Sequence, residues 1–109
     1  MLAANPEWEV CGEASDGQEA ILKAIQLQPD VVIMDISMPG LSGLRATQRI
    51  REALPQTEVL MLTMHESREM IRAAREAGAR GYLVKSDADS HLIEAMRAVS
   101  RHEAYFPSV

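Results

Sequence analysis

VVIMD at residues 31–35 decides the fold, because four consecutive apolar residues end in a single carboxylate. Two later runs have the same form: VLMLT at residues 59–63 ends in a hydroxyl, and YLVK at residues 82–85 ends in an ammonium group. Apolar runs of strand length are typical of parallel strands in a sheet that is covered on both faces. The sequence therefore predicts an α/β domain in which ligands bind beyond the carboxyl ends of these strands.

Asp35, Thr63 and Lys85 stand at those three strand ends, so we expect them to share one crevice. An aspartate can take a phosphoryl group from a high-energy donor, which adds up to about two negative charges. At about 4 Å and an effective dielectric of about 20, the Lys85 ammonium would contribute roughly 4 kcal/mol of attraction before desolvation. A hydrogen bond from Thr63 contributes only about 1 kcal/mol. The alternative is structural: Asp35 caps a helix or simply pairs with Lys85.

Composition bounds the function of the chain. Its 109 residues are 47% hydrophobic and 25% charged, which predicts one globular domain over residues 1–109. The net charge of −5 argues against direct binding of nucleic acid. Cys11 is the single cysteine, and no stretch of the sequence is long and apolar enough to span a bilayer. We therefore expect a cytoplasmic domain with no membrane contact.

Hydrophobic spacing predicts strands that alternate with four helices. A short strand is expected at residues 9–14, and the first helix begins after Asp16 as N-cap, with Glu19 in the capping-box position. The other helices are expected at residues 43–53, at residues 66–77, and from Ser86 or Asp87 onward. The side chains expected to face inward are Ala20, Ile21, Ala24, Ile25, Leu44, Thr47, Ile50, Met70, Ile71, Ala74, Ala77, Leu92, Ile93, Met96 and Val99. This alternation implies parallel strands, right-handed crossovers and helices on both faces of the sheet.

Residues 29–43, followed by Leu62-Thr63 and by residues 78–85, resemble the receiver domain of two-component response regulators. Within that family, residues 62–65 and 85–87 are most similar to the LuxR/NarL-type transcriptional regulators. The likeness covers nearly the whole chain. It implies a flavodoxin-like fold, a doubly wound parallel sheet of which this chain would hold about four strands and four helices.

The resemblance also implies roles for particular residues. Asp35 would accept a phosphoryl group from a sensor histidine kinase, and Lys85 would contact the phosphate. Thr63 and Tyr82 would form the switch pair. Family members use Mg²⁺, for which Asp35 and the backbone carbonyl of Ser37 would be ligands. The chemistry would be limited to self-phosphorylation from a phosphohistidine donor and autodephosphorylation, so we do not expect an enzyme.

The chain departs from the family pattern at its amino-terminal end, where the first strand, its acidic pair and most of the first helix are expected to be missing. Without the acidic pair, binding of Mg²⁺ should be weakened or lost. We expect the strand at residues 9–14 either to close up against residues 31–35 or to pair with a second copy in a strand-exchanged dimer. Residues 103–109 resemble the start of a linker to an output domain that is not in this chain.

Two other functions stay open. The first is a phosphorylation-deficient pseudo-receiver that acts as a module for protein interaction or dimerisation. The second is a hydrolase of the haloacid dehalogenase type, although Ser37 stands where that class places a second aspartate. The histidines have no ligand spacing and no acidic company in the sequence, so a metal site among them is not expected. A face of small residues is expected to mediate dimerisation, by analogy with the family: Ala73, Ala77, Tyr82, Ala95 and Ala98.

Overall fold

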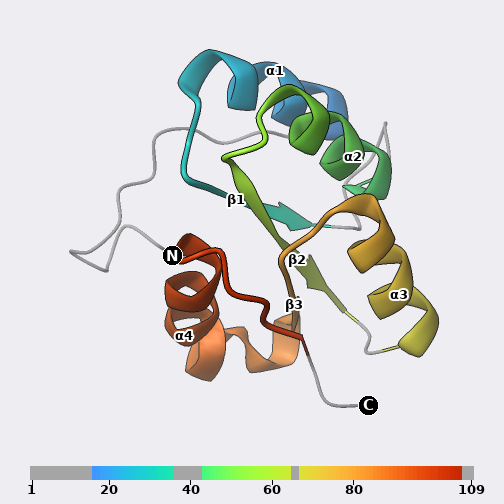
Figure 1. The fold of residues 1–109 in the computed structure, drawn as a ribbon. Helices are drawn as coiled ribbons and strands as arrows, with labels where there is room; N and C mark the ends of the chain where they lie inside the picture. Colours follow the sequence, from blue (N-terminus) through green and yellow to red (C-terminus); the bar gives the residue numbers. More distant parts are fainter. Residues whose placement is uncertain (1–15, 36–42, 65–66, 107–109) are drawn as a thin grey trace.

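The computed structural model describes residues 16–35, 43–64 and 67–106 (Figure 1). Helices and strands alternate along them as the apolar runs predict. The elements are α1 (Gly17–Leu27), β1 (Val31–Asp35), α2 (Gly43–Ala53), β2 (Glu58–Thr63), α3 (Arg68–Ala77), β3 (Gly81–Val84), the short 3-10 helix η2 (Lys85–Asp87) and α4 (Ala88–Ser100). The expected strand at residues 9–14 lies outside the described residues.

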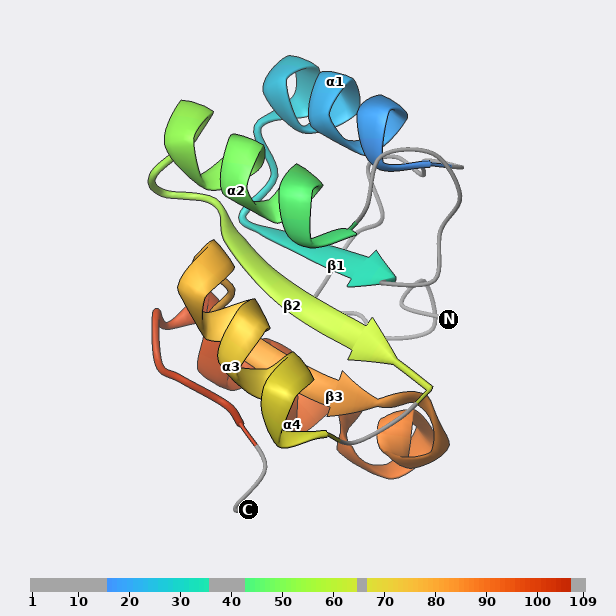
Figure 2. The same ribbon diagram turned by 90° about the vertical axis from the view of Figure 1, so that its right-hand side faces the viewer.

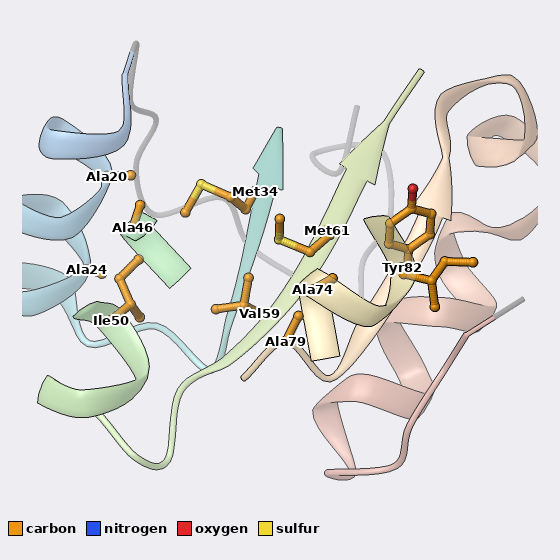
Figure 3. Close-up of a cluster of buried hydrophobic side chains, with 11 residues drawn as sticks. Ala20, Ala24, Met34, Ala46, Ile50, Val59, Met61, Ala74, Ala79 and Tyr82 are labelled. Atoms are coloured by element: carbon orange, nitrogen blue, oxygen red, sulfur yellow. The ribbon is translucent and has the colours of Figure 1, made fainter. Parts of the chain in front are cut away.

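The three described strands form a parallel sheet in the order β1-β2-β3. One face packs against α2 and α3, with α1 beside α2, and α4 covers the other face (Figure 2). Side chains alternate between the faces, because successive residues of a strand point to opposite sides. Met61 belongs to the cluster on the α2 and α3 side (Figure 3). Leu60 and Leu83 instead pack with α4. The doubly wound arrangement expected from the sequence is confirmed.

Local signals explain where the helices begin and end. The Asp16 side chain accepts a hydrogen bond from the Glu19 N–H at 2.8 Å, which confirms Asp16 as the N-cap of α1. The third helix begins at Arg68 rather than at residue 66, because Ser67 is its N-cap and accepts from the Met70 N–H. It ends at Gly78, whose φ of 101° glycine adopts without strain. The last helix begins at Ala88, after η2.

Two expected core residues are wrong. Ile25 is 45% exposed and Ile93 is 44% exposed. In α1 the buried contacts come from small residues, Ala20 and Ala24, because this helix packs against α2 rather than directly on the sheet. In α4 the contact stripe includes Ala95, and Ile93 lies outside it. No helix among the described residues is long and apolar enough to cross a membrane.

The chain returns to the sheet after α4. His102 adopts a left-handed conformation with φ of 63°, and Tyr105 then forms a parallel bridge with Gly81 at the outer edge of β3. A side chain at position 81 would not fit, since a Cβ there would lie 2.7 Å from the Leu60 side chain and 2.9 Å from that of Val99. Residues 103–106, expected to begin a linker, are therefore packed on the domain.

Candidate functional site

Asp35 and Lys85 meet at the carboxyl end of the sheet. Asp35 is the last residue of β1, and Lys85 directly follows β3. The Lys85 Nζ donates a hydrogen bond to the Asp35 Oδ2 at 2.7 Å. The two side chains are 32% and 33% exposed, so a small anionic group from solvent can reach both. The convergence of these two strand ends, predicted from the apolar runs, is confirmed.

Thr63 ends the strand that lies between the two charged groups. It is paired in register with Val84, and β2 separates β1 from β3, so Thr63 stands at the same edge of the sheet as Asp35 and Lys85. The residue is 6% exposed. Its position is thus fixed by pairing with β3 and by burial, which suits a donor that must meet one defined acceptor.

Tyr82 is fully buried in the middle of β3. It is paired with Met61 in register and belongs to the core cluster between the sheet and α3 (Figure 3). The strand that holds Tyr82 also leads directly to Lys85. The sequence prediction of a switch role for this ring is not tested by these positions. Ser37, the other expected site residue, lies outside the described residues.

Mg²⁺ requires nearly octahedral coordination by oxygen atoms. The described part of the chain holds no group of three or more His, Cys, Asp or Glu side chains that could bind a metal ion. Asp35 alone, already paired with Lys85 at 2.7 Å, does not make such a site. The described residues therefore do not by themselves fit the expected ion.

Histidine surroundings differ from the sequence expectation, which gave these residues no acidic neighbours. His91 Nδ1 lies 3.6 Å from Glu94 Oε2, and His102 Nδ1 lies 2.6 Å from Glu58 Oε2. His91 and Glu94 are three residues apart on one helix, whereas His102 reaches Glu58 only through the turn after α4. Each described histidine therefore pairs with a carboxylate.

Glu58 is the centre of a charged cluster that sequence reasoning missed. Its side chain is 1% exposed at the start of β2, at the end of the sheet opposite to Asp35. Arg80 Nε donates to Glu58 Oε2 at 3.0 Å. Arg51 Nη1 lies 2.9 Å from Glu58 Oε1, but it donates its hydrogen bonds to backbone carbonyls, including that of Pro55. Glu58 Oε1 therefore accepts no hydrogen bond within the described part of the chain and is stabilised by the charge of Arg51. A glutamate just before an apolar run was the available signal.

The expected dimerisation face of small residues is not a surface. Ala77, Tyr82 and Ala95 are buried within the chain. Only Ala73 and Ala98 of that set are partly exposed. The three buried side chains pack within the domain, and a role of this region in dimerisation stays a prediction.

Comparison with known proteins identifies the same family as the motifs. The family model for the response regulator receiver domain matches residues 1–97. Oxygen regulatory protein NreC of Staphylococcus carnosus is 47% identical over 106 residues, which cover 96% of this chain and 49% of that protein. An uncharacterised transcriptional regulatory protein of Bacillus subtilis, YxjL, is 41% identical over 109 residues, which cover all of this chain and 50% of that protein. The chain thus spans about half the length of these two relatives.

Solved structures agree. A two-component response regulator of the LuxR family from Aurantimonas sp. superposes with a TM-score of 0.88 at 35% identity, covering 93% of this chain and 72% of that one. The signal receiver domain of the response regulator NarL from Mycobacterium tuberculosis gives a TM-score of 0.85 at 30% identity, covering 92% and 81%. With its flavodoxin-like sheet and the Asp35–Lys85 pair at the carboxyl end, this chain belongs to the response regulator receiver domains, and within them to the LuxR/NarL type.

Proposed function

We propose that Asp35 is the phosphoacceptor of this receiver and that Lys85 and Thr63 hold the transferred group. One observation carries the proposal: an accessible carboxylate lies 2.7 Å from an ammonium group at the carboxyl end of the sheet. An ion pair this exposed contributes little to folding stability. Asp35 can therefore exchange its contact with Lys85 for another partner at low cost. The placement of Thr63 on the strand between them supports its part in the same site.

The transfer is a displacement at phosphorus. A carboxylate oxygen of Asp35 forms the new bond, the bond from phosphorus to the donor's histidine nitrogen breaks, and that nitrogen keeps the electron pair. The product is an acyl phosphate, which water later hydrolyses. The transferred group brings up to about two negative charges. The Lys85 ammonium is already close enough to neutralise part of this negative charge. After transfer, Lys85 would contact the phosphoryl oxygens instead of the carboxylate.

Thr63 and Tyr82 are proposed to report the modification. A phosphoryl oxygen gives the Thr63 hydroxyl a charged acceptor, and such hydrogen bonds are stronger than neutral ones. Thr63 ends its strand, so a small shift there moves the loop that follows. The ring of Tyr82 is buried on the neighbouring strand, where a change in packing has two discrete outcomes rather than a gradual one.

Partners and output follow from family membership. Receiver domains of response regulators interact with sensor histidine kinases, and their own phosphorylation and dephosphorylation activity is weak. We propose the same partner here, and regulation of transcription through a part of the protein outside these residues. The relatives' names support this, because one is a transcriptional regulatory protein and another an oxygen regulatory protein. Self-association, including strand exchange, stays a prediction that sedimentation at several concentrations would test.

The experiment is phosphorylation by acetyl phosphate, followed by intact mass measurement. The wild-type chain should gain the mass of one phosphoryl group, and Asp35→Asn should gain none. Asp30→Asn is the matched control, since Asp30 is an exposed aspartate just before the same strand. Equal labelling of wild type and Asp35→Asn would show that another residue is modified.

Running the reaction with and without Mg²⁺ tests the expectation of weak metal binding. Receiver domains generally bind Mg²⁺, so strong dependence on the ion would show that this chain completes a metal site with residues other than those described here. An unmodified wild-type chain under both conditions, with histidine kinase present as a second donor, would favour the pseudo-receiver.

A further inference from the structure

Residues 104–106 lie along the outer edge of β3, where Tyr105 pairs with Gly81 at the start of the strand. The Tyr82 N–H donates to the Tyr105 carbonyl at 2.8 Å, and the Tyr105 N–H donates to the Arg80 carbonyl at 3.0 Å. These bonds and the isolated parallel bridge to Gly81 hold the segment along the edge of β3 (Figure 1).

Consecutive side chains anchor this segment on both faces of the sheet. Tyr105 packs with the cluster under α4, and its hydroxyl donates to Glu94 Oε2 at 3.1 Å. Phe106 packs with the cluster on the other face, and the Arg75 guanidinium lies 4.0 Å from the centroid of its ring. A cation over an aromatic face contributes about 0.5–1 kcal/mol at an exposed site. The segment thus joins α3 to α4 across the edge of β3.

The start of the segment is held as well. The Glu103 N–H donates to the Ala98 carbonyl at 2.9 Å, and His102 contacts the buried Glu58. Five consecutive residues after α4 therefore follow one path, fixed by backbone hydrogen bonds, the contact between His102 and Glu58, and two packed rings. We expect a segment held in this way to move together with the edge of β3.

Strand β3 connects the segment to the phosphoacceptor. The Tyr82 N–H is bonded to the segment, and Lys85, three residues later, is bonded to Asp35. A cavity of about 150 Å³ lies beside this stretch, lined by residues 82–84, Asp87, His91, Tyr105 and Phe106. This cavity is partly open to solvent, so the rings that line it have room to change position.

We propose that attachment of residues 103–106 to β3 is energetically coupled to the Asp35–Lys85 pair, so that phosphorylation of Asp35 loosens the segment. This inference rests on the proposed function. The attached arrangement is the one in which Lys85 binds the free carboxylate directly. A phosphoryl group between the two residues displaces Lys85 and the end of β3 that bears it. This displacement strains the contacts that attach residues 103–106 to β3 in the unphosphorylated form. Coupling between two sites is reciprocal, so weaker attachment must favour the phosphorylated form by the same factor.

The first test needs no phosphorylation. Hydrogen exchange is measured at the Tyr82 amide in the wild-type chain and in Asp35→Asn, with the Glu58 amide, which donates to the Asp30 carbonyl, as the reference. Loss of the ion pair should raise exchange at Tyr82 relative to Glu58 roughly fivefold or more, the lower limit of typical coupling. An unchanged ratio of the two rates would overturn the coupling.

The second test measures the reciprocal effect at equilibrium. Beryllofluoride, an anion that mimics a phosphoryl group, is titrated in the presence of Mg²⁺ into wild type, Arg75→Ala and Phe106→Ala. Both variants weaken attachment and should bind the anion roughly fivefold more tightly. Arg72→Ala, which removes an exposed arginine of the same helix, should bind like wild type. Thermal unfolding verifies that each variant folds, and two independent variants protect against a loss of folding in one.

The two proposals fail in different ways. Equal or weaker binding of beryllofluoride by both attachment variants overturns the coupling, even if the wild type is phosphorylated normally. A wild-type chain that takes neither beryllofluoride nor a phosphoryl group refutes the proposed function. The exchange rate at Tyr82 in Asp35→Asn then still decides whether the ion pair and the segment are linked.

Discussion

The two ends of the sheet hold the same kinds of charged side chain in opposite surroundings. At the carboxyl end, Asp35 and Lys85 form one ion pair in which each side chain is about a third exposed, at 33% and 32%. At the amino end, Glu58 is 1% exposed between Arg51 and Arg80. If one partner of the first pair is removed, water can solvate the other. Glu58 is buried, so water cannot take the place of its cationic neighbours.

This difference separates a site for chemistry from a structural element. Exposed pairs contribute about 0–1 kcal/mol, so the cost of exchanging one partner for a phosphoryl oxygen is low. Removal of one partner from a buried pair costs about 3–5 kcal/mol, because a charge is left without compensation. Glu58 joins α2, the residue before β3 and the turn after α4 through Arg51, Arg80 and His102. Charged contacts at the amino end of the sheet are therefore costly to break, whereas those at the carboxyl end can be exchanged at low cost.

The largest effect should come from Glu58→Gln. We expect this variant to lose about 2–3 kcal/mol of unfolding free energy, below the full range for buried pairs because the arginines reach solvent. Urea denaturation measures the loss. Glu52→Gln, at an exposed position of α2, should stay within about 0.5 kcal/mol of wild type. Equal losses in the two variants would remove the contrast between the ends of the sheet.

Asp35→Asn should cost much less, under about 1 kcal/mol, because Lys85 can turn to water when its partner is gone. The same urea denaturation measures this value. The variant thus combines a nearly intact fold with the loss of phosphorylation proposed above. If Asp35→Asn unfolds as easily as Glu58→Gln, the pair at the carboxyl end is structural and the site for chemistry lies elsewhere.

The contrast also marks what the sequence could predict. Strand β1 (Val31–Asp35) and helix α2 (Gly43–Ala53) have the expected bounds, because an apolar run and the Leu54-Pro55 stop are local signals. Asp35 and Lys85 were predictable neighbours for a topological reason: parallel strands bring their carboxyl ends to one edge. That reasoning needs no knowledge of side-chain packing.

The Glu58 cluster could not be predicted in the same way. Arg51, Glu58, Arg80 and His102 belong to four separate segments, and they meet only when strand register and the turn after α4 are known. The bridge at Tyr105 was missed because a single paired residue is too short for a period-2 pattern. The exposure of Ile25 depends on which neighbour its helix packs against, which helical spacing does not specify.

A smaller effect concerns salt. A double-mutant cycle on Asp35 and Lys85 should give a coupling energy of at most about 1 kcal/mol at low ionic strength, falling toward zero near 1 M salt. The corresponding cycle on Glu58 and Arg80 should keep most of its coupling energy, because a buried carboxylate is screened much less. Unfolding free energies at two salt concentrations provide both values. Equal salt dependence would contradict the assignment of one buried and one open pair.

The smallest predicted effect is a pH-dependent change in stability that comes from the partial burial of the Tyr105 hydroxyl. Partial burial raises the pKa of the Tyr105 hydroxyl above 10.0, and its hydrogen bond to Glu94 raises this pKa further. A raised pKa of an acid in the folded state means that its contribution to stability is complete below the ordinary pKa and is lost as the pH rises through the folded one. Wild type should therefore lose slightly more stability than Tyr105→Phe between about pH 9 and pH 11. Urea midpoints at the two pH values measure the difference. If Tyr105→Phe loses as much as wild type, the hydroxyl titrates alike in both states, and partial burial of Tyr105 has no energetic consequence.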